Sequence, residues 1–473
     1  MKKTLRRAVA VTAASAAGLA AALVVTPTAT AETAPKAVVS APAGALTTSG
    51  RLERTGFGYK ADVFGAKVLL EGVEVRGLKD GYAQQRCTTM AGRVAEKQSQ
   101  LALPEDLVPL VDLSLTKQRS ETYQEGGRTG VRGISTIADI AVGGEVPGLG
   151  KLPRLKIEGL QSVADAFHDG RSFDHEESFG FKGISLDYDG TVVDGTPLAA
   201  LLDILNQVTA PVSQVVNQVI DLLTSLLPGQ AIRIPGLGSL ALGTAKGSAN
   251  ATSGTSEAYA LKLEITATGN PTVLQLGRAR TRISEAGPAG VFRGTATGAN
   301  ILGDVPLLNL GNLGQRSIPC EGTDGRVVTQ KAAHYSLLGG LVDVSGVTYK
   351  LMGDHLRGGA AKAMIGTDLG TVAVPTLGLE IKGLSSLVHL KRSATSGKVA
   401  PRVTTKYLQI LHDGRPVSLR AGDSYDLGDG NFLNFKKLFD RTFHGIGVHG
   451  LTLQLAGIGV LDLASSAGRI FPR

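Results

Sequence analysis

One long phrase occurs twice in the sequence, and this repeat limits the possible folds more than any other feature. The segment VPGLGKLPRLKIEGLQSV (146–163) returns as VPTLGLEIKGLSSL (374–387). Further matches follow in the same order: QRC with QRSIPC, GRVAEKQ with GRVVTQK, LVDLS with LVDVS, and LDYDGTVV with ILHDGRPV. A shared order over such a distance predicts two tandem copies of one folding unit. We place a Pro/Ala/Ser/Thr linker at 32–50, the first half at 51–245 and the second at 246–473.

The local pattern in both copies predicts β-strands. Stretches such as RLKIEGL, YALKLEIT and LTLQLAGIGVLDL alternate apolar and polar residues, which is typical of half-buried strands. The segments HDGR and YDG between such stretches are Asp-Gly turn signals for hairpins. The 62 glycines and the absence of Trp fit many small-residue strands joined by tight turns. We therefore predict a mainly β fold with two tandem related halves of mostly antiparallel strands, each carrying one amphipathic helix.

The helix in each half is predicted from apolar spacing. A segment near 197–227 places Leu and Val at alternating steps of four and three, and a segment near 431–443 places Phe at steps of three and four. Pro211 is expected to kink or split the first helix. The predicted apolar faces comprise Leu201, Leu205, Val208, Val212, Val215, Val219, Leu222, Leu226, Phe432, Phe435, Phe439 and Phe443. Two interpretations stay open: each face packs on its own sheet, or it lines a groove that holds lipid.

The N-terminal segment has the order of a secretory signal peptide. Residues 1–31 contain four basic residues, an Ala/Val/Leu-rich run and Ala-Thr-Ala, which predicts cleavage between Ala31 and Glu32. An uncleaved membrane anchor is the alternative. No later apolar run is long enough to span a bilayer, so we expect no transmembrane helix in the mature chain. The leader holds four of the 49 basic residues and no acid, so the formal charge falls from +8 to +4. This balance predicts no nucleic-acid partner.

The chain has only two cysteines, Cys87 and Cys320, and they occupy corresponding positions in the two copies. An even, small number of cysteines in an exported protein predicts a disulfide. Such a bond would require the two copies to meet there. Two thiols cannot build a tetrahedral all-cysteine zinc site.

Known catalytic signatures are missing from the sequence. It contains no G-x-S-x-G, no Walker-type loop and no H-E-x-x-H. We interpret the polar cluster HDGRSFDHEE (168–177) as a hairpin tip, and the aspartates of GDSYDLGDGN (422–431) as a turn and cap, with a divalent cation as the alternative for each. Dispersed carboxylates for glycoside hydrolysis are not excluded, but 4% aromatic residues are few for a sugar cleft. We predict no catalytic residue, no metal site and no cofactor.

The leader, the Thr/Ala-rich linker, the Gly/Ala/Leu strands with VPGLG-type turns and the widely spaced Cys pair resemble actinobacterial secreted and cell-wall surface proteins. The most similar group is the choice-of-anchor P and LAETG-anchored group, and the resemblance in style covers most of the mature chain. It implies a noncatalytic surface protein. The final segment, LDLASSAGRIFPR, departs from the sorting signal of anchored relatives. We therefore expect a secreted protein that is released or held noncovalently on the cell wall.

These observations lead to one functional expectation and two alternatives. We expect an exported noncatalytic envelope or extracellular protein with a structural, adhesive or binding role toward an unidentified envelope or extracellular partner. The first alternative is a carrier of lipid or another apolar small molecule, which would contain a continuous apolar cavity. The second is a secreted hydrolase, which would bring carboxylates together in a polar cleft.

Overall fold

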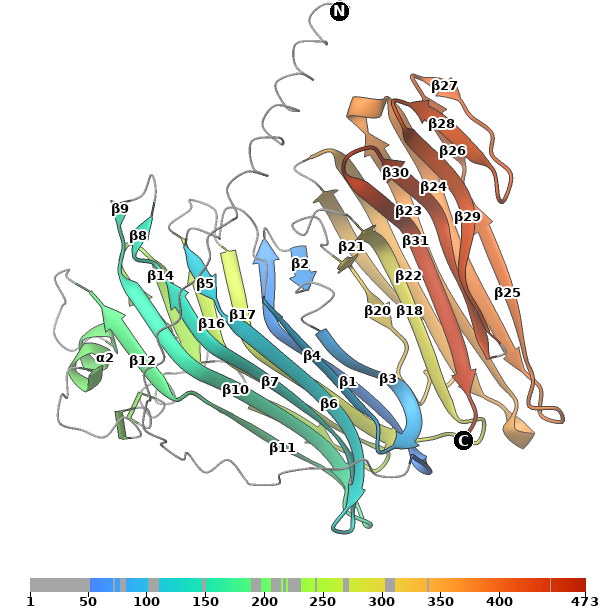
Figure 1. Cartoon of the computed structure of the whole chain (residues 1–473). Coiled ribbons are helices and arrows are strands. Elements are labelled where there is room, and N and C mark those ends of the chain that lie inside the picture. Colours follow the sequence, from blue (N-terminus) through green and yellow to red (C-terminus); the bar gives the residue numbers. More distant parts are fainter. Residues whose placement is uncertain are drawn as a thin grey trace, which may run out of the picture. The chain divides into compact units, whose positions relative to one another are not determined.

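The structure is a computed structural model, and it is built almost entirely of antiparallel strands (Figure 1). It confirms the predicted mainly β class. The residues that it describes are 52–70, 73–76, 82–100, 110–146, 150–188, 197–205, 214–215, 218–219, 231–242, 245–266, 272–302, 311–337, 340–442 and 444–473.

Four large sheets and one small hairpin account for the strands of the described residues. Sheet I comprises β1 (Glu53–Leu70), β2 (Val73–Arg76), β3 (Tyr82–Ala91), β13 (Ile232–Ile234), β14 (Gly238–Leu242), β15 (Ala245–Ala249), β16 (Ser253–Ile265) and β17 (Thr272–Glu285). Sheet II comprises β4 (Val94–Gln100), β5 (Val111–Leu113), β6 (Leu115–Glu125), β7 (Arg128–Val142), β10 (Arg154–His168), β11 (Phe173–Gly180) and β12 (Gly183–Asp187). The small hairpin joins β8 (Glu145–Val146) to β9 (Gly150–Lys151).

The other two sheets belong to the C-terminal part of the chain. Sheet III comprises β18 (Val291–Leu302), β19 (Gly311–Leu313), β20 (Arg316–Ser317), β28 (Ser424–Gly428), β29 (Asn431–Thr442), β30 (Gly445–Leu455) and β31 (Gly459–Phe471). Sheet IV comprises β21 (Val328–Leu337), β22 (Val342–His355), β23 (Ala361–Val374), β24 (Leu379–Arg392), β25 (Val399–Lys406), β26 (Gln409–His412) and β27 (Arg415–Pro416). The helical elements of the described residues include α2 (Pro197–Leu205) and the 3-10 turns η4 (Arg357–Gly359) and η5 (Pro375–Leu377).

The sheets pack in pairs and form two β-sandwiches. In the first sandwich β10 of sheet II packs on β16 and β17 of sheet I, and β7 packs on β1 and β17. In the second, β23 and β24 of sheet IV pack on β31 of sheet III. The large buried apolar clusters stay within one sandwich or the other. Each sandwich therefore has its own hydrophobic core, as expected for facing sheets.

Small residues let the two sheets of each sandwich approach closely. A Cβ atom added at Gly133 would lie 2.7 Å from Val63, and one added at Gly294 would lie 2.6 Å from Ile365. The hydroxyl oxygens of Ser386 and Ser466 are 2.7 Å apart across the second interior. At these positions no space remains for a larger side chain, because the interior is already filled to contact distance.

The glycine of the repeated phrase has the same role in both halves. Gly159 and Gly383 have φ angles of 62° and 61°, a left-handed conformation that favours glycine. On β10, the edge partner is β12 before Gly159 and β11 after it. On β24, the edge partner is β26 before Gly383 and β25 after it. The glycine thus marks the point where one long strand changes its neighbour.

Strand order also repeats between the two halves. Sheet II runs β11-β10-β7-β6-β4, and sheet IV runs β25-β24-β23-β22-β21. The predicted boundary between residues 245 and 246 needs correction, since it falls inside β15. Both β15 and the preceding β14 pair with β16, and β17 pairs with β1. The change from one sandwich to the next lies between Glu285 and Val291. The matched phrases missed it because the last strands of the first sandwich return to pair with its first strand.

The predicted helix near 431–443 is wrong. These residues form strand β29, which pairs with β28 and β30 and includes Phe432, Phe435 and Phe439. Phe435 is buried in the core, Phe432 is half-buried and Phe439 is exposed, so the three do not share one apolar face. Phe has a high propensity for strands. The backbone hydrogen bonds of β29 with β28 and β30 stabilise a strand here, although the Phe residues have a helical spacing. Phe443 lies outside the described residues. Only the first half therefore keeps its predicted helix.

The structure describes part of the helix predicted near 197–227. Leu201 of α2 is fully buried, and Leu205 packs partly buried against the same core. Of the short described helical pieces further on, Val215 is half-buried and Val219 is fully buried. The remaining predicted positions lie outside the described residues: Val208, Pro211, Val212, Leu222 and Leu226. Because α2 contacts β12 and β13, its described part packs on its own sandwich.

The close approach of the sheets predicts the effect of enlarging a glycine. Gly294→Val should lower the free energy of unfolding by about 1–3 kcal/mol, because the new side chain would overlap Ile365 and Ile318. Gly180→Val is the matched control, since Gly180 also lies in a strand but its Cβ would meet no atom within 4 Å. The control should change stability by about 0.5 kcal/mol or less. Equal urea midpoints for the two variants would contradict a filled interior.

Candidate functional site

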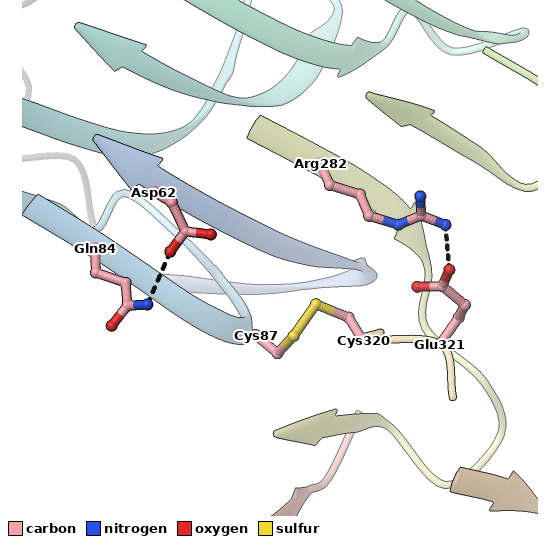
Figure 2. The surroundings of a disulfide bond; sticks show 6 residues. All are labelled: Asp62, Gln84, Cys87, Arg282, Cys320 and Glu321. Carbon is pink, nitrogen blue, oxygen red and sulfur yellow. Dashed lines mark hydrogen bonds and ion pairs between the residues drawn. A yellow bond between two sulfur atoms is a disulfide. The ribbon is translucent and has the colours of Figure 1, made fainter. Parts of the chain in front are cut away.

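The predicted disulfide between Cys87 and Cys320 is confirmed. Cys87 lies on β3 of the first sandwich, Cys320 follows β20 of the second, and their Cα atoms are 5.3 Å apart (Figure 2). Both cysteines are buried and pack with Ala286 and Val291. The bond joins residues 233 positions apart, so it links the two sandwiches directly. Such a bond is compatible with an extracellular protein.

Further contacts surround this bond. Arg282 of β17 pairs with Glu321, the residue after Cys320, as Figure 2 shows. The hydroxyl of Thr89 donates to the carbonyl oxygen of Pro472 at 3.4 Å. A Cβ atom at Gly58 would lie 3.1 Å from the Cβ of Cys320. The sandwiches therefore meet through packing and polar contacts as well as through the disulfide.

Arginines gather beside this junction. Arg293 of β18 and Arg469 of β31 are register partners on neighbouring strands, so their side chains project from the same face. Like charges directly opposite each other are unfavourable. Burial, together with repulsion from Arg86, Arg469 and Arg93, lowers the pKa of Arg293 to about 10. Four guanidinium groups thus concentrate positive charge where the two sandwiches meet.

The partners of these arginines leave the charge largely uncompensated. Arg469 pairs with Asp440, whereas Arg293 pairs with no carboxylate of the described residues and its guanidinium lies 6.0 Å from the ring centre of Phe471. Arg86 donates from Nε to the amide oxygen of Gln84. Burial and the charge of Arg86 lower the pKa of Arg469 as well. Guanidinium groups in this arrangement can bind an anion.

Sequence analysis missed this cluster. Arg86, Arg293 and Arg469 are far apart along the chain, and only strand pairing and the packing of β3 on β18 bring them together. The excess of basic residues was the one available signal, and it gave no position. Of the predicted site residues, Cys87 and Cys320 meet. Among the described apolar positions, Leu201 and Val219 are buried in the core of the first sandwich and Phe435 in the core of the second.

A serine, a histidine and an aspartate lie together on sheet III. His449 Nδ1 is 2.6 Å from Ser465 Oγ, and His449 Nε2 is 3.3 Å from Asp462 Oδ2. Thr452 donates to the other oxygen of Asp462 at 2.8 Å, and Phe439 stacks on the imidazole. These residue types also form hydrolase triads. Here, however, Ser465 and Asp462 are buried within β31, which is paired on both sides. We interpret the group as a structural hydrogen-bond network.

A second buried hydrogen-bond and ion-pair network lies on the outer face of sheet II and joins β6, β7 and β10. Asp165 accepts hydrogen bonds from the Tyr123 hydroxyl at 2.8 Å and from Arg132 Nε at 2.9 Å. Burial raises the pKa of Asp165, while Arg132 and Tyr123 act in the opposite direction. Glu121 forms ion pairs with Arg132 and Arg119. These carboxylates are engaged by arginine, which suits a stabilising network more than an acid–base pair.

The two polar loops considered from sequence form ordinary turns. Asp169 accepts from the backbone N–H groups of Arg171 and Ser172, both at 2.8 Å, at the tip between β10 and β11. Asp423 and Asp426 accept backbone hydrogen bonds in the same way, and Asp429 lies in the turn between β28 and β29. No group of three metal-ligating side chains occurs among the residues that the structure describes.

Two further sequence predictions concern the signal cleavage site and membrane-spanning helices. The cleavage pair Ala31 and Glu32 lies outside the described residues. Within the described ranges, no helix has the length and apolar character needed to cross a membrane.

Fold and junction define the class: a protein of two β-sandwiches linked by one disulfide. No protein-family model matches the chain. No curated protein gives a significant match either. Among solved structures, a match is found to the crystal structure of lipopolysaccharide binding protein, with 10% sequence identity and a TM-score of 0.12. It covers 88% of this chain and 100% of that chain. A TM-score this low supports no conclusion about fold or function.

The disulfide predicts a redox-dependent stability. Replacing both cysteines (Cys87→Ser with Cys320→Ser) should lower the free energy of unfolding by about 3–5 kcal/mol, because the bond closes a very long loop. Thermal unfolding with and without reductant measures the effect. The double variant is its own control, since reductant should leave its melting temperature unchanged. A wild-type protein insensitive to reductant would contradict the prediction.

The buried imidazole predicts a pH dependence. Burial and Lys437 lower the pKa of His449 below its usual 6.5, although Asp462 opposes the shift. Between the folded and unfolded pKa values the unfolded chain binds more protons. The contribution of the neutral, buried His449 to the free energy of unfolding is therefore fully present above about pH 6.5. It is lost as the pH falls from there through the lower pKa of the folded state.

An NMR titration of the His449 ring protons tests this directly. The midpoint should lie below 6.5, and a His449→Gln variant should lose stability less steeply below that pH. A midpoint above 6.5 would show that the attraction of Asp462 outweighs burial.

Proposed function

We propose that this protein is exported and acts in the cell envelope or outside the cell as a noncatalytic structural, adhesive or binding protein. The observation that carries the proposal is the disulfide between Cys87 and Cys320, which links two separately packed sandwiches. Disulfides of this structural kind persist in oxidising compartments and are rare in the cytosol. The signal-peptide pattern of residues 1–31 supports the same location.

Packing inside the sandwiches supports action through the surface. A carrier of lipid needs an apolar cavity, whereas Gly133 and Gly294 lie in direct contact with the facing sheets. The described part of α2 also packs on its core instead of standing away from it. A hydrolase needs free carboxylates in a cleft, and the buried carboxylates of Asp165 and Glu121 are already paired with arginine. Binding through an exposed face therefore suits the structure better than carriage or hydrolysis.

The proposal includes an origin by duplication. Its units are 52–285 and 291–473, each a sandwich with the same strand order. Left-handed residues also recur at matching places, with Gly277 on β17 and Ala464 on β31. Two copies that each bring one cysteine to the junction would explain why the chain carries one pair. The resemblance in sequence supports a place at or outside an actinobacterial cell wall.

Intact-mass spectrometry of the protein from its native host tests the proposal. We expect a culture-medium or wall fraction in which the chain begins at Glu32 and its mass is lighter by two hydrogens than that of the reduced chain. Reduction should restore these two hydrogens. Native spectra should show no bound lipid.

Three results would count against the proposal. A chain that retains residues 1–31 inside the cell would overturn export. A free thiol at Cys87 would remove the compartment argument. Extra mass that is lost on denaturation and identified as lipid would favour the carrier instead.

A further inference from the structure

We propose that Arg86, Arg293 and Arg469 form an anion-binding site, at the contact of the two sandwiches, that takes a phosphate group. The site would give the binding role proposed above a ligand class, and it rests on that role. Arg86 comes from the first sandwich, and the other two come from the second.

The arrangement of the strands brings these side chains together. Arg293 and Arg469 are directly opposite each other on β18 and β31, and β3, which carries Arg86, packs on β18. The disulfide from Cys87, the next residue after Arg86, fixes β3 at this place. A ligand that contacts all three arginines would therefore contact both halves of the protein.

The lack of a countercharge at Arg293 points to a missing ligand. Other half-buried arginines have a partner for the guanidinium. Arg132 pairs with Asp165, Arg278 with Glu257 and Arg282 with Glu321, while Arg316 and Arg392 donate to backbone carbonyl oxygens. Arg293 pairs with no acid of the described residues, although it is equally withdrawn from water. Burying a charge without a partner is costly. Repulsion from Arg86, Arg93 and Arg469 adds to this cost, and a bound anion would remove both penalties.

The chemistry of the side chains favours phosphate. A guanidinium group offers a planar fork of donors that matches phosphate oxygens, and several forks can share one tetrahedral group. The ring centre of Phe471 lies 6.0 Å from the guanidinium of Arg293, at the outer limit of a cation–π contact. Asp440 neutralises only Arg469, so the cluster keeps a net positive charge. The phosphate could come from free inorganic phosphate or from the headgroup of an anionic lipid.

The first experiment measures thermal stability and calorimetric binding of the disulfide-bonded mature protein with sodium phosphate. Wild-type protein should gain melting temperature with phosphate, because ligand binding to the folded state stabilises it. Arg293→Gln should weaken phosphate binding at least about tenfold, since a charge-assisted contact is lost. Without phosphate this variant should melt at the same temperature or higher, because repulsion is relieved. A purely structural arginine would give a lower melting temperature instead.

Matched variants separate the site from general charge. Arg86→Gln changes an exposed residue of the first sandwich and should also weaken binding, whereas Arg402→Gln changes an exposed arginine of β25 and should not. If all three variants bind phosphate like wild type, or if wild type shows no phosphate-dependent shift and no lipid binding, the site is overturned.

Vesicle sedimentation distinguishes the two sources. Vesicles of phosphatidylcholine alone are compared with vesicles that also contain phosphatidylglycerol. Cosedimentation only with phosphatidylglycerol, lost in Arg293→Gln, identifies a headgroup. A calorimetric phosphate signal without sedimentation, lost in the same variant, identifies free phosphate. Each result supports the site, and neither depends on the export test, so a failure here leaves the exported disulfide-linked protein intact.

Discussion

The close approach of the facing sheets is the constraint on which both sandwiches depend. Gly133 packs against Val63 of the facing sheet, and Gly294 packs against Ile365. The hydroxyl groups of Ser386 and Ser466 form a hydrogen bond between the sheets of the second sandwich. Large side chains at the centre would force the sheets apart, and the lost contacts would be felt throughout the core. This constraint explains why small residues occupy these positions. It also leaves the described interior little room for a ligand, so binding falls to the outer faces and the junction.

At the junction, attractive and repulsive interactions oppose each other. The disulfide from Cys87 to Cys320 and the ion pair of Arg282 with Glu321 draw the sandwiches together. Arg86 of the first sandwich repels Arg293 and Arg469 of the second across the same contact. This repulsion between arginines, beside the disulfide, is the basis of the proposed phosphate site.

The sequence predicted the fold where its signals were local or repeated. Alternation along LKIEGL and YALKLEIT predicted strands, and the compartment argument predicted the disulfide; both predictions are confirmed. The helix near 431–443 failed because Phe432, Phe435 and Phe439 follow a helical spacing, while the ladder to β30 stabilises a strand. The boundary at residues 245 and 246 failed for a similar reason: the pairing of β17 with β1 is invisible to local pattern.

The sequence by itself determined the strand content and the cysteine pair, because the first depends on residue type at a fixed local spacing and the second on the number of cysteines and the predicted export. Only the tertiary structure decided which strands share a sheet, where one sandwich ends and which charges meet. Arg86 and Arg293 show the difference, since nothing near either residue in the chain indicates the other. Their proximity comes from pairing and packing across long loops, which depend on the free energy of the whole fold and not on any single segment.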